Sequence, residues 1–414
     1  MSKITKIEAR EILDSRGNPT LEVDTTVEEK FTGRFSVPSG ASTGEHEALE
    51  KRDKDPEHFL GKGVEKLAER IEKEIAPELL SKYFNQKSLD QFLIDKDGTK
   101  NKSNFGANTI LSLSMSFAKA DAYANGMPLW QYFSKLSGTK PSLPTPMINI
   151  INGGVHADSG LDIQEFMIVP LDGGKFSKLL QKSDEVFMYL KIILEENDLG
   201  TAVGDEGGFV PRVGSHNKAL DLIIKAIEKA KFKPGEDFGI ALDCAASEFY
   251  ERGEYVLKSE NKNFSSNELT AYYENLIKNY PIVSLEDPFA EDDWETWTSF
   301  NQKFGGKLMV VGDDLLVTNL ERLDKAVAEK AVNAILIKPN QSGTLIETLG
   351  VINQAKKSEL KTIISHRSGE TEDTSISHLA VGTASQYIKA GSVSRSERIA
   401  KYNELLRIEE ELGG

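Results

Sequence analysis

Six apolar segments in the second half of the chain each close with an ionisable residue. These residues are Asp243, Glu286, Asp313, Lys338, His366 and Lys389. Consecutive members lie 23 to 43 residues apart, which is about the length of one strand–helix–strand unit. In a closed barrel of parallel strands, the carboxyl ends of the strands share one face, and that face carries the active site. One polar residue at a strand end is ordinary surface chemistry, but six in order predict a shared site.

The first three of these residues are carboxylates. Asp243, Glu286 and Asp313 would offer oxygen ligands from neighbouring strands, a donor set that suits a hard cation such as Mg²⁺. The sequence does not favour zinc, because Cys244 is its one cysteine and it has no HExxH motif. The alternative is that the acids form salt bridges with Lys338 or Lys389.

The two lysines close later segments. Lys338 and Lys389 near one another and near a cation would depress each other's pKa, as a lysine general base requires near neutral pH. Ordinary exposed lysines are the alternative.

Two further segments carry acids. Residues 204–209 place two acids, Asp205 and Glu206, among glycines, and an acid there could donate a proton to a leaving group; a tight acidic turn is the alternative. Residues 162–169 are typical of a strand that starts with polar residues, among them Gln164 and Glu165.

Three loops complete the candidate site. Residues 38–44 and 152–158 are rich in small residues and predict mobile lids, with plain surface loops as the alternative. In residues 365–370, Arg367 and Ser368 suit a phosphate group through charge-assisted hydrogen bonds. The remaining histidines have no such context and are interpreted as surface or packing residues: His46, His58, His216 and His378.

These residues need a scaffold, and the pattern predicts an α/β chain. Between the apolar segments lie amphipathic helices at 217–231, 319–330 and 343–357, which indicates a parallel sheet with crossover helices. We therefore expect a C-terminal (β/α)8 TIM-type barrel. Ahead of it we expect a smaller N-terminal α+β domain, with strands at 4–12, 21–27 and 31–37 and helices at 64–80 and 107–125.

A proline-containing stretch separates the two halves. Residues 137–146 hold three prolines and one glycine, so we expect domains at 1–136 and 137–414. No repeat of solenoid period is present in the sequence.

Composition limits the possible classes of function. The 414 residues are 39% hydrophobic and 28% charged, as in soluble globular proteins. The net charge of -15 disfavours nucleic-acid binding. The sequence contains no 18-residue apolar run and no apolar leader at its N-terminus, and it has one cysteine, so we expect no membrane span and a cytoplasmic location.

Taken together, these motifs resemble the enolase family from residue 13 to residue 403. The matching segments are SGASTG (39–44), INGGVHAD (151–158), DIQEFMIVP (162–170), GDEGGF (204–209), SLEDPF (284–289), GDDLLVTN (312–319), ILIKPNQSGT (335–344), SHRSGE (365–370) and IKAGSVSRSERIAKYN (388–403).

The resemblance implies a Mg²⁺-dependent lyase that reversibly dehydrates 2-phosphoglycerate to phosphoenolpyruvate through an aci-carboxylate intermediate. It implies Lys338 as the base at C2 and Glu206 as the acid at the C3 hydroxyl, assisted by Glu165. It implies Asp243, Glu286 and Asp313 as ligands of a first Mg²⁺, and Ser42 as a group that helps to hold a second. The implied substrate contacts are His156 (also counted among the catalytic groups), Gln164, Glu165, His366, Arg367, Ser368 and Lys389.

The family also implies a homodimer or an octamer. Two alternative functions stay open. One is another activity of the same superfamily, such as a racemase or cycloisomerase, although those relatives usually carry KxK or HxD patterns. The other is a binding protein displayed on the cell surface, or such a presence in addition to the enzyme.

Overall fold

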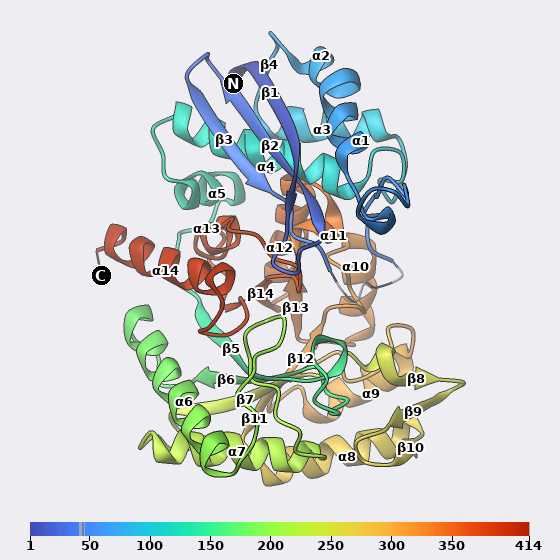
Figure 1. Cartoon of the computed structure of the whole chain (residues 1–414), viewed down its shortest axis with the longest axis vertical. Coiled ribbons are helices and arrows are strands. Elements are labelled where there is room, and N and C mark those ends of the chain that lie inside the picture. The colour runs from blue at the N-terminus through green and yellow to red at the C-terminus, as the bar shows by residue number, and fades with distance from the viewer. Residues whose placement is uncertain (41–43, 45, 414) are drawn as a thin grey trace.

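The computed structural model describes residues 1–40, 44 and 46–413, and for His156 it describes the backbone alone. Figure 1 shows an N-terminal sheet and its helices lying against a larger C-terminal barrel. The predicted fold class is thereby confirmed, whereas the domain boundary at residue 137 stays a prediction. None of the described helices combines the length and the apolar composition that a transmembrane span requires.

The N-terminal part is built on an antiparallel sheet of order β3-β2-β1-β4. Its strands are β1 (Ser2–Leu13), β2 (Pro19–Val27), β3 (Phe31–Ser36) and β4 (Tyr83–Phe84). Its helices are η1 (Phe59–Gly61), α1 (Glu65–Arg70), the π-helix η2 (Ile71–Ile75), α2 (Ala76–Leu79), α3 (Gln86–Asp97), α4 (Ala107–Ala124) and α5 (Leu129–Ser137).

Helix α4 packs directly on the sheet. Apolar and small residues cover nearly its whole circumference, so the helix is buried, as one between two layers must be. A β-carbon at Gly33 of β3 would come within 2.2 Å of the Ser116 carbonyl oxygen, so glycine allows this close approach.

Eight strands within the described residues close into a barrel of order β11-β12-β13-β14-β15-β5-β6-β7. They are β5 (Thr145–Asn152), β6 (Glu165–Pro170), β7 (Phe238–Asp243), β11 (Ile282–Glu286), β12 (Met309–Gly312), β13 (Ala334–Ile337), β14 (Lys361–Ser365) and β15 (Tyr387–Lys389). The six predicted apolar segments all form barrel strands. Those of the six that lie next to one another in the ring pair in parallel.

The start of the barrel departs from a regular (β/α)8 repeat. Strand β6 runs antiparallel to both β5 and β7, and residues 153–164 join β5 to β6 without a crossover α-helix. The reversal places the first residue of β6, Glu165, beside the last residue of β7, Asp243. Polar residues at the start of this strand therefore reach the same face as the polar ends of its neighbours.

Helices surround the barrel, and side chains fill it. The barrel half contains η3 (Gly154–His156), α6 (Phe176–Glu196), α7 (His216–Lys229), η4 (Ala246–Phe249), α8 (Ser266–Asn279), α9 (Trp294–Phe304), α10 (Leu320–Glu329), α11 (Pro339–Ser342), α12 (Leu345–Lys357), α13 (Ser375–Gly382) and α14 (Ser396–Glu411). Inward-facing residues such as Met167, Val311 and Leu336 form one buried cluster, so the barrel is packed and not hollow.

A small sheet that the sequence patterns did not predict projects between η4 and α8. It consists of β8 (Tyr250–Glu251), β9 (Glu254–Leu257) and β10 (Lys262–Phe264) in the order β10-β9-β8.

The N-terminal part caps a barrel helix. The Asp90 carboxylate of α3 accepts the backbone N–H of Ile346 at the start of α12, at 2.9 Å. The Ser114 hydroxyl of α4 accepts the N–H of Leu345 at 3.0 Å. These contacts satisfy helix-terminal N–H groups that have no partner within the helix.

Candidate active site

A polar pocket lies at the face of the barrel where the strands end. Its lining contains most of the predicted site residues, namely Gln164, Glu165, Glu206, Asp243, Lys338, His366, Arg367, Ser368 and Lys389, together with Gly40 and Ser365. The structure thus brings together residues from both halves of the sequence. Ser42 lies outside the described residues, and so does the side chain of His156.

Lys389 is the charge centre of this face. Its ammonium group lies 2.8 Å from Glu286 Oε1, 3.0 Å from Glu165 Oε1 and 3.1 Å from Asp243 Oδ2. Register explains the cluster, because Glu165 pairs with Asp243 and Asp243 pairs with Glu286 across β6, β7 and β11. Strand β15 lies opposite β11 in the ring, so the Lys389 side chain spans the mouth of the barrel.

The second lysine forms a separate pair. Lys338 donates to Asp313 Oδ2, and Gln341 of α11 donates to Asp313 Oδ1 at 3.1 Å. Gln341 in turn accepts the hydroxyl hydrogen of Thr318 at 2.7 Å. The alternative of salt bridging is therefore present at both lysines.

Lys389 lowers the pKa of Lys338, as predicted, but the net pKa of neither lysine falls in this arrangement. Burial lowers the pKa of Lys338, but the acids near it, Asp313 first, together outweigh burial and the net pKa is raised. Burial also acts to lower the pKa of Lys389, yet the carboxylates around it, Asp243 first, hold that pKa well above its usual range. Each lysine faces opposite charge more closely than it faces the other lysine.

Two buried acids on this face have pKa values above the usual range, because burial and neighbouring carboxylates disfavour their charged forms. Burial, followed by repulsion from Glu206, raises the pKa of Glu165 well above its usual range. Burial, followed by repulsion from Asp243, does the same for Glu286. Two buried carboxylates with raised pKa values around one lysine are typical of a functional site.

Glu206, in the 204–209 segment, lies close to Glu165 and His366, and ligand atoms of the three residues are within 4.8 Å of one another. Its Oε2 accepts hydrogen bonds from Asn149 at 2.9 Å and Asn152 at 3.4 Å, both on β5. Its Oε1 lies 3.8 Å from His366 Nε2. Burial lowers the pKa of His366 well below its usual value, so this imidazole is neutral.

Arg398 of α14 fixes the tautomer of that histidine. Its Nη1 donates to His366 Nδ1 at 2.5 Å, so the proton of the neutral ring is on Nε2 and points toward Glu206. The guanidinium also donates to the carbonyl oxygens of Arg367 at 2.6 Å and Ser368 at 2.7 Å. Its side chain is fully buried.

Arg367 and Ser368 lie where the N-terminal half meets the barrel. Arg367 donates to both carboxylate oxygens of Glu47, at 3.1 and 3.2 Å, and to Asn340 Oδ1 at 3.0 Å. Burial acts to lower the pKa of Arg367, but the nearby acids, Glu47 first, together outweigh burial and the pKa is raised. The guanidinium is therefore charged, and it already binds both oxygens of one carboxylate, that of Glu47.

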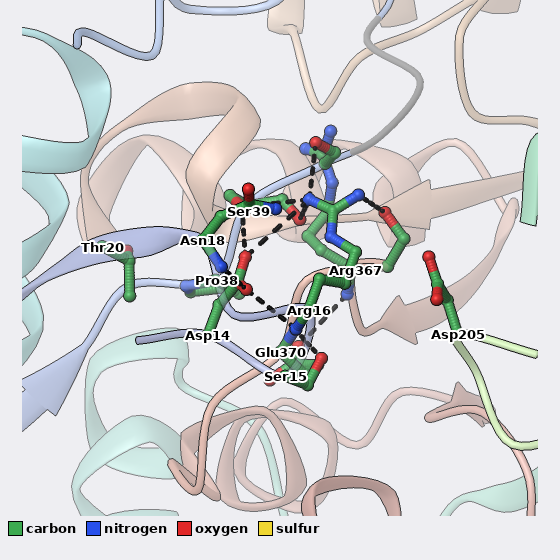
Figure 2. A network of polar contacts seen from close by, with 12 residues as sticks. Asp14, Ser15, Arg16, Asn18, Thr20, Pro38, Ser39, Asp205, Arg367 and Glu370 are labelled. Carbon is green, nitrogen blue, oxygen red and sulfur yellow. Dashed lines mark hydrogen bonds and ion pairs between the residues drawn. The ribbon is translucent and has the colours of Figure 1, made fainter. Parts of the chain in front are cut away.

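The turn between β1 and β2 supports this corner of the pocket (Figure 2). The Asp14 carboxylate accepts the backbone N–H of Arg16 at 2.8 Å, which shapes the turn. The Arg16 guanidinium donates to the Ser368 hydroxyl at 3.3 Å. The Ser15 N–H donates to the Glu370 carbonyl at 2.7 Å, so the turn is docked on the 365–370 segment.

The predicted magnesium ligands fit a hard cation. Glu286 Oε2 is buried, and no donor among the described residues lies within hydrogen-bond distance of it. Asp243, Glu286 and Asp313 offer oxygens alone, and two of them already surround a positive charge at Lys389. Asp313 also lies in a second acidic group with Asp287 and Asp314, whose ligand atoms are within 4.8 Å of one another.

Several supporting residues were missed by the motif analysis. They are Arg398, Glu47, Gln341, Asn149 and Asn152. Arg398, Gln341 and Asn152 fall inside the matching motifs, which was the available signal, but none of them lies at the end of a predicted strand.

Comparison with protein families agrees with this geometry. Residues 4–133 match the model described as "Enolase, N-terminal domain", and residues 140–414 match "Enolase, C-terminal TIM barrel domain". Together the matches cover nearly the whole chain and support a lyase of the enolase type. The chain therefore belongs to the enolase family.

Proposed function

We propose that this protein is a Mg²⁺-dependent phosphopyruvate hydratase that interconverts 2-phosphoglycerate and phosphoenolpyruvate. The observation that carries the proposal is that one pocket is lined by Lys338, Glu206 and Glu165 together with Arg367 beside Ser368. A phosphorylated hydroxy acid needs a cationic phosphate subsite, a base at C2 and an acid at C3.

Arg367 and Ser368 would bind the phosphate. The guanidinium holds the two oxygens of Glu47 side by side, and a phosphate offers the same pair of acceptors. Non-phosphorylated acids, as racemases and cycloisomerases use, carry no phosphate to take the place of the Glu47 carboxylate on this guanidinium.

Lys338, as the free amine, would take the C2 proton, and the electron pair left at C2 would delocalise into the substrate carboxylate. The C3–O bond would then break, and the hydroxyl would leave as water with a proton from Glu206. Glu165 would assist, since its raised pKa favours the protonated form. Lys389, Gln164, His366 and His156 would orient the substrate.

Mg²⁺ held by Asp243, Glu286 and Asp313, with a second ion near Ser42, would supply charge stabilisation for the developing dianion and weaken the hold of Asp313 on the Lys338 proton. Homodimeric or octameric assembly and a cytoplasmic location belong to the same proposal, on the strength of the resemblance.

The test follows the absorbance of phosphoenolpyruvate formed from 2-phosphoglycerate with Mg²⁺. Lys338→Ala and Glu206→Gln should each lower kcat by roughly 10²–10⁴-fold. Lys100→Ala is the matched control, because Lys100 is an exposed lysine paired with Glu321. Turnover by wild type with EDTA in excess, or near-normal kcat in Lys338→Ala, would contradict the proposal. Turnover of a non-phosphorylated acid instead would favour the superfamily alternative.

A further inference from the structure

His216 is a fully buried histidine outside the pocket, and the proposed mechanism does not use it. It is the first residue of α7, and none of its side chain is exposed. Its position in the sequence suggested a packing or surface role. Its hydrogen bonds in the structure indicate a more specific one.

The ring nitrogen Nε2 accepts two backbone hydrogen bonds. The N–H of Asp162 lies 3.2 Å away and the N–H of Ile163 lies 3.3 Å away. Backbone amides are donors alone, so Nε2 must present its lone pair. The Ser259 hydroxyl also lies 3.1 Å from Nε2, but its hydrogen is directed to the Asp162 carboxylate at 2.5 Å.

The other ring nitrogen belongs to a chain of hydrogen bonds in which every donor points toward Glu260. Nδ1 lies 2.8 Å from the Tyr272 hydroxyl, which lies 3.4 Å from Glu260 Oε1. With Nε2 an acceptor, the neutral ring carries its proton on Nδ1, which donates to the Tyr272 oxygen, and the Tyr272 hydroxyl hydrogen then goes to Glu260. Every polar atom of the ring is used, and it is used in one tautomer.

The environment keeps the ring neutral. Asp162 and Glu260 are the charged groups that face it, at 3.8 and 3.6 Å, and Tyr272 faces it from α8. Burial outweighs the two carboxylates and lowers the pKa of His216 to about 4.

The two amides that His216 holds lead directly into the pocket. Gln164 and Glu165 follow them, and both line the pocket. The Gln164 N–H donates to the Asp243 carbonyl at 2.9 Å, so the His216 contacts and the β7 contact fix successive residues of one short segment.

We infer that His216 is a positioning residue, which through Asp162 and Ile163 sets the backbone that presents Gln164 and Glu165 to the substrate. The kinetic part of this inference rests on the proposed function, and the backbone part does not.

The test compares His216→Ala and His216→Gln with His378→Ala as the matched control. His378 is a mostly buried histidine on α13, paired with Glu404, that contacts none of these residues. Hydrogen exchange at the amides of residues 161–165 reports the anchor directly, and kcat and KM for 2-phosphoglycerate report its effect. In wild type, ¹⁵N resonances of the imidazole report the tautomer without any substitution.

We expect faster exchange at 162 and 163 in His216→Ala, with kcat lower by roughly 10- to 100-fold and KM nearly unchanged, because the phosphate contacts come from another segment. His216→Gln, which keeps an acceptor, should recover most of the protection and of kcat, and His378→Ala should show neither change.

Unchanged exchange in His216→Ala would overturn the inference, as would a wild-type ring with its proton on Nε2. The second result is decisive even if both variants fail to fold. If wild type does not convert 2-phosphoglycerate, the proposed function fails, while the exchange and tautomer measurements still decide the role of His216.

Discussion

A buried aspartate between the two halves of the molecule makes a quantitative prediction about pH. Asp90 of α3 is fully buried, and its carboxylate accepts hydrogen bonds from Gln86 and from the N–H of Ile346, both at 2.9 Å. Burial outweighs these hydrogen bonds and raises the pKa of Asp90 from 3.8 to about 7. The native state therefore keeps a proton that the unfolded chain has already released.

The sign and the size follow from proton linkage. Between the unfolded and the folded pKa the native state binds more protons, so the free energy of unfolding falls as pH rises. The shift of about three units corresponds to roughly 4 kcal/mol, fully present below pH 3.8 and lost as pH approaches 7. Asp90→Asn has no proton to lose and should not show this decline.

The assay is urea denaturation of wild type and Asp90→Asn at a series of pH values from about 4.5 to about 8, a range set by these pKa values. Relative to wild type, the variant should gain roughly 3 kcal/mol across the range, because the range starts above the unfolded pKa. Asp95→Asn is the matched control, since Asp95 lies on the same helix and is exposed. A difference between wild type and Asp90→Asn that is constant with pH would refute the reasoning.

Three more predictions concern the pocket. Lys389→Met removes the cation shared by buried carboxylates and should cost roughly 3–5 kcal/mol of stability, measured by urea denaturation; an unchanged midpoint would contradict the assigned charge balance. Arg398→Lys cannot reproduce the guanidinium fork that fixes His366, and the loss of roughly 1.5–3 kcal/mol of hydrogen bonding should raise KM for 2-phosphoglycerate about tenfold or more, an effect that steady-state kinetics would reveal or exclude. Mg²⁺ added to EDTA-treated protein should stabilise it by roughly 2.7 kcal/mol at a hundredfold excess over Kd, and Glu286→Gln should lose most of that gain in the same titration.

The sequence was informative about strand ends because that information is local. Each of the six apolar segments carries its own β-strand pattern and its own terminal side chain, so Glu286 or Lys389 could be assigned to a barrel end without knowing its neighbours. In the helices between them, apolar residues recur at helical spacing, so these helices could be predicted in the same way. Strand β5 was not, since the run from Thr145 to Asn152 follows closely on prolines and contains asparagines that look like loop residues.

Strand direction and long-range partners are not local. Nothing in the pattern of β6 says which way it runs, because direction is decided by pairing with β5 and β7. Likewise, Glu47 meets Arg367 from the other half of the chain, and no spacing rule connects them. The net pKa shifts of Lys338 and Lys389 could not be predicted for the same reason, because the direction of each shift depends on which carboxylates lie nearest in space.

The pairing of β15 with β5 bears on how the protein is made. Tyr387 pairs with Thr145, so the last strand of the barrel closes on the first across almost the whole C-terminal half of the chain. During synthesis the ribosome must deliver β15 before the ring can close, and until then β5 and β14 present open edges that favour aggregation. The N-terminal sheet pairs strands that are close in sequence and can form earlier. Since β15 ends in Lys389, the step that seals the barrel also delivers the positive charge that its buried acids need.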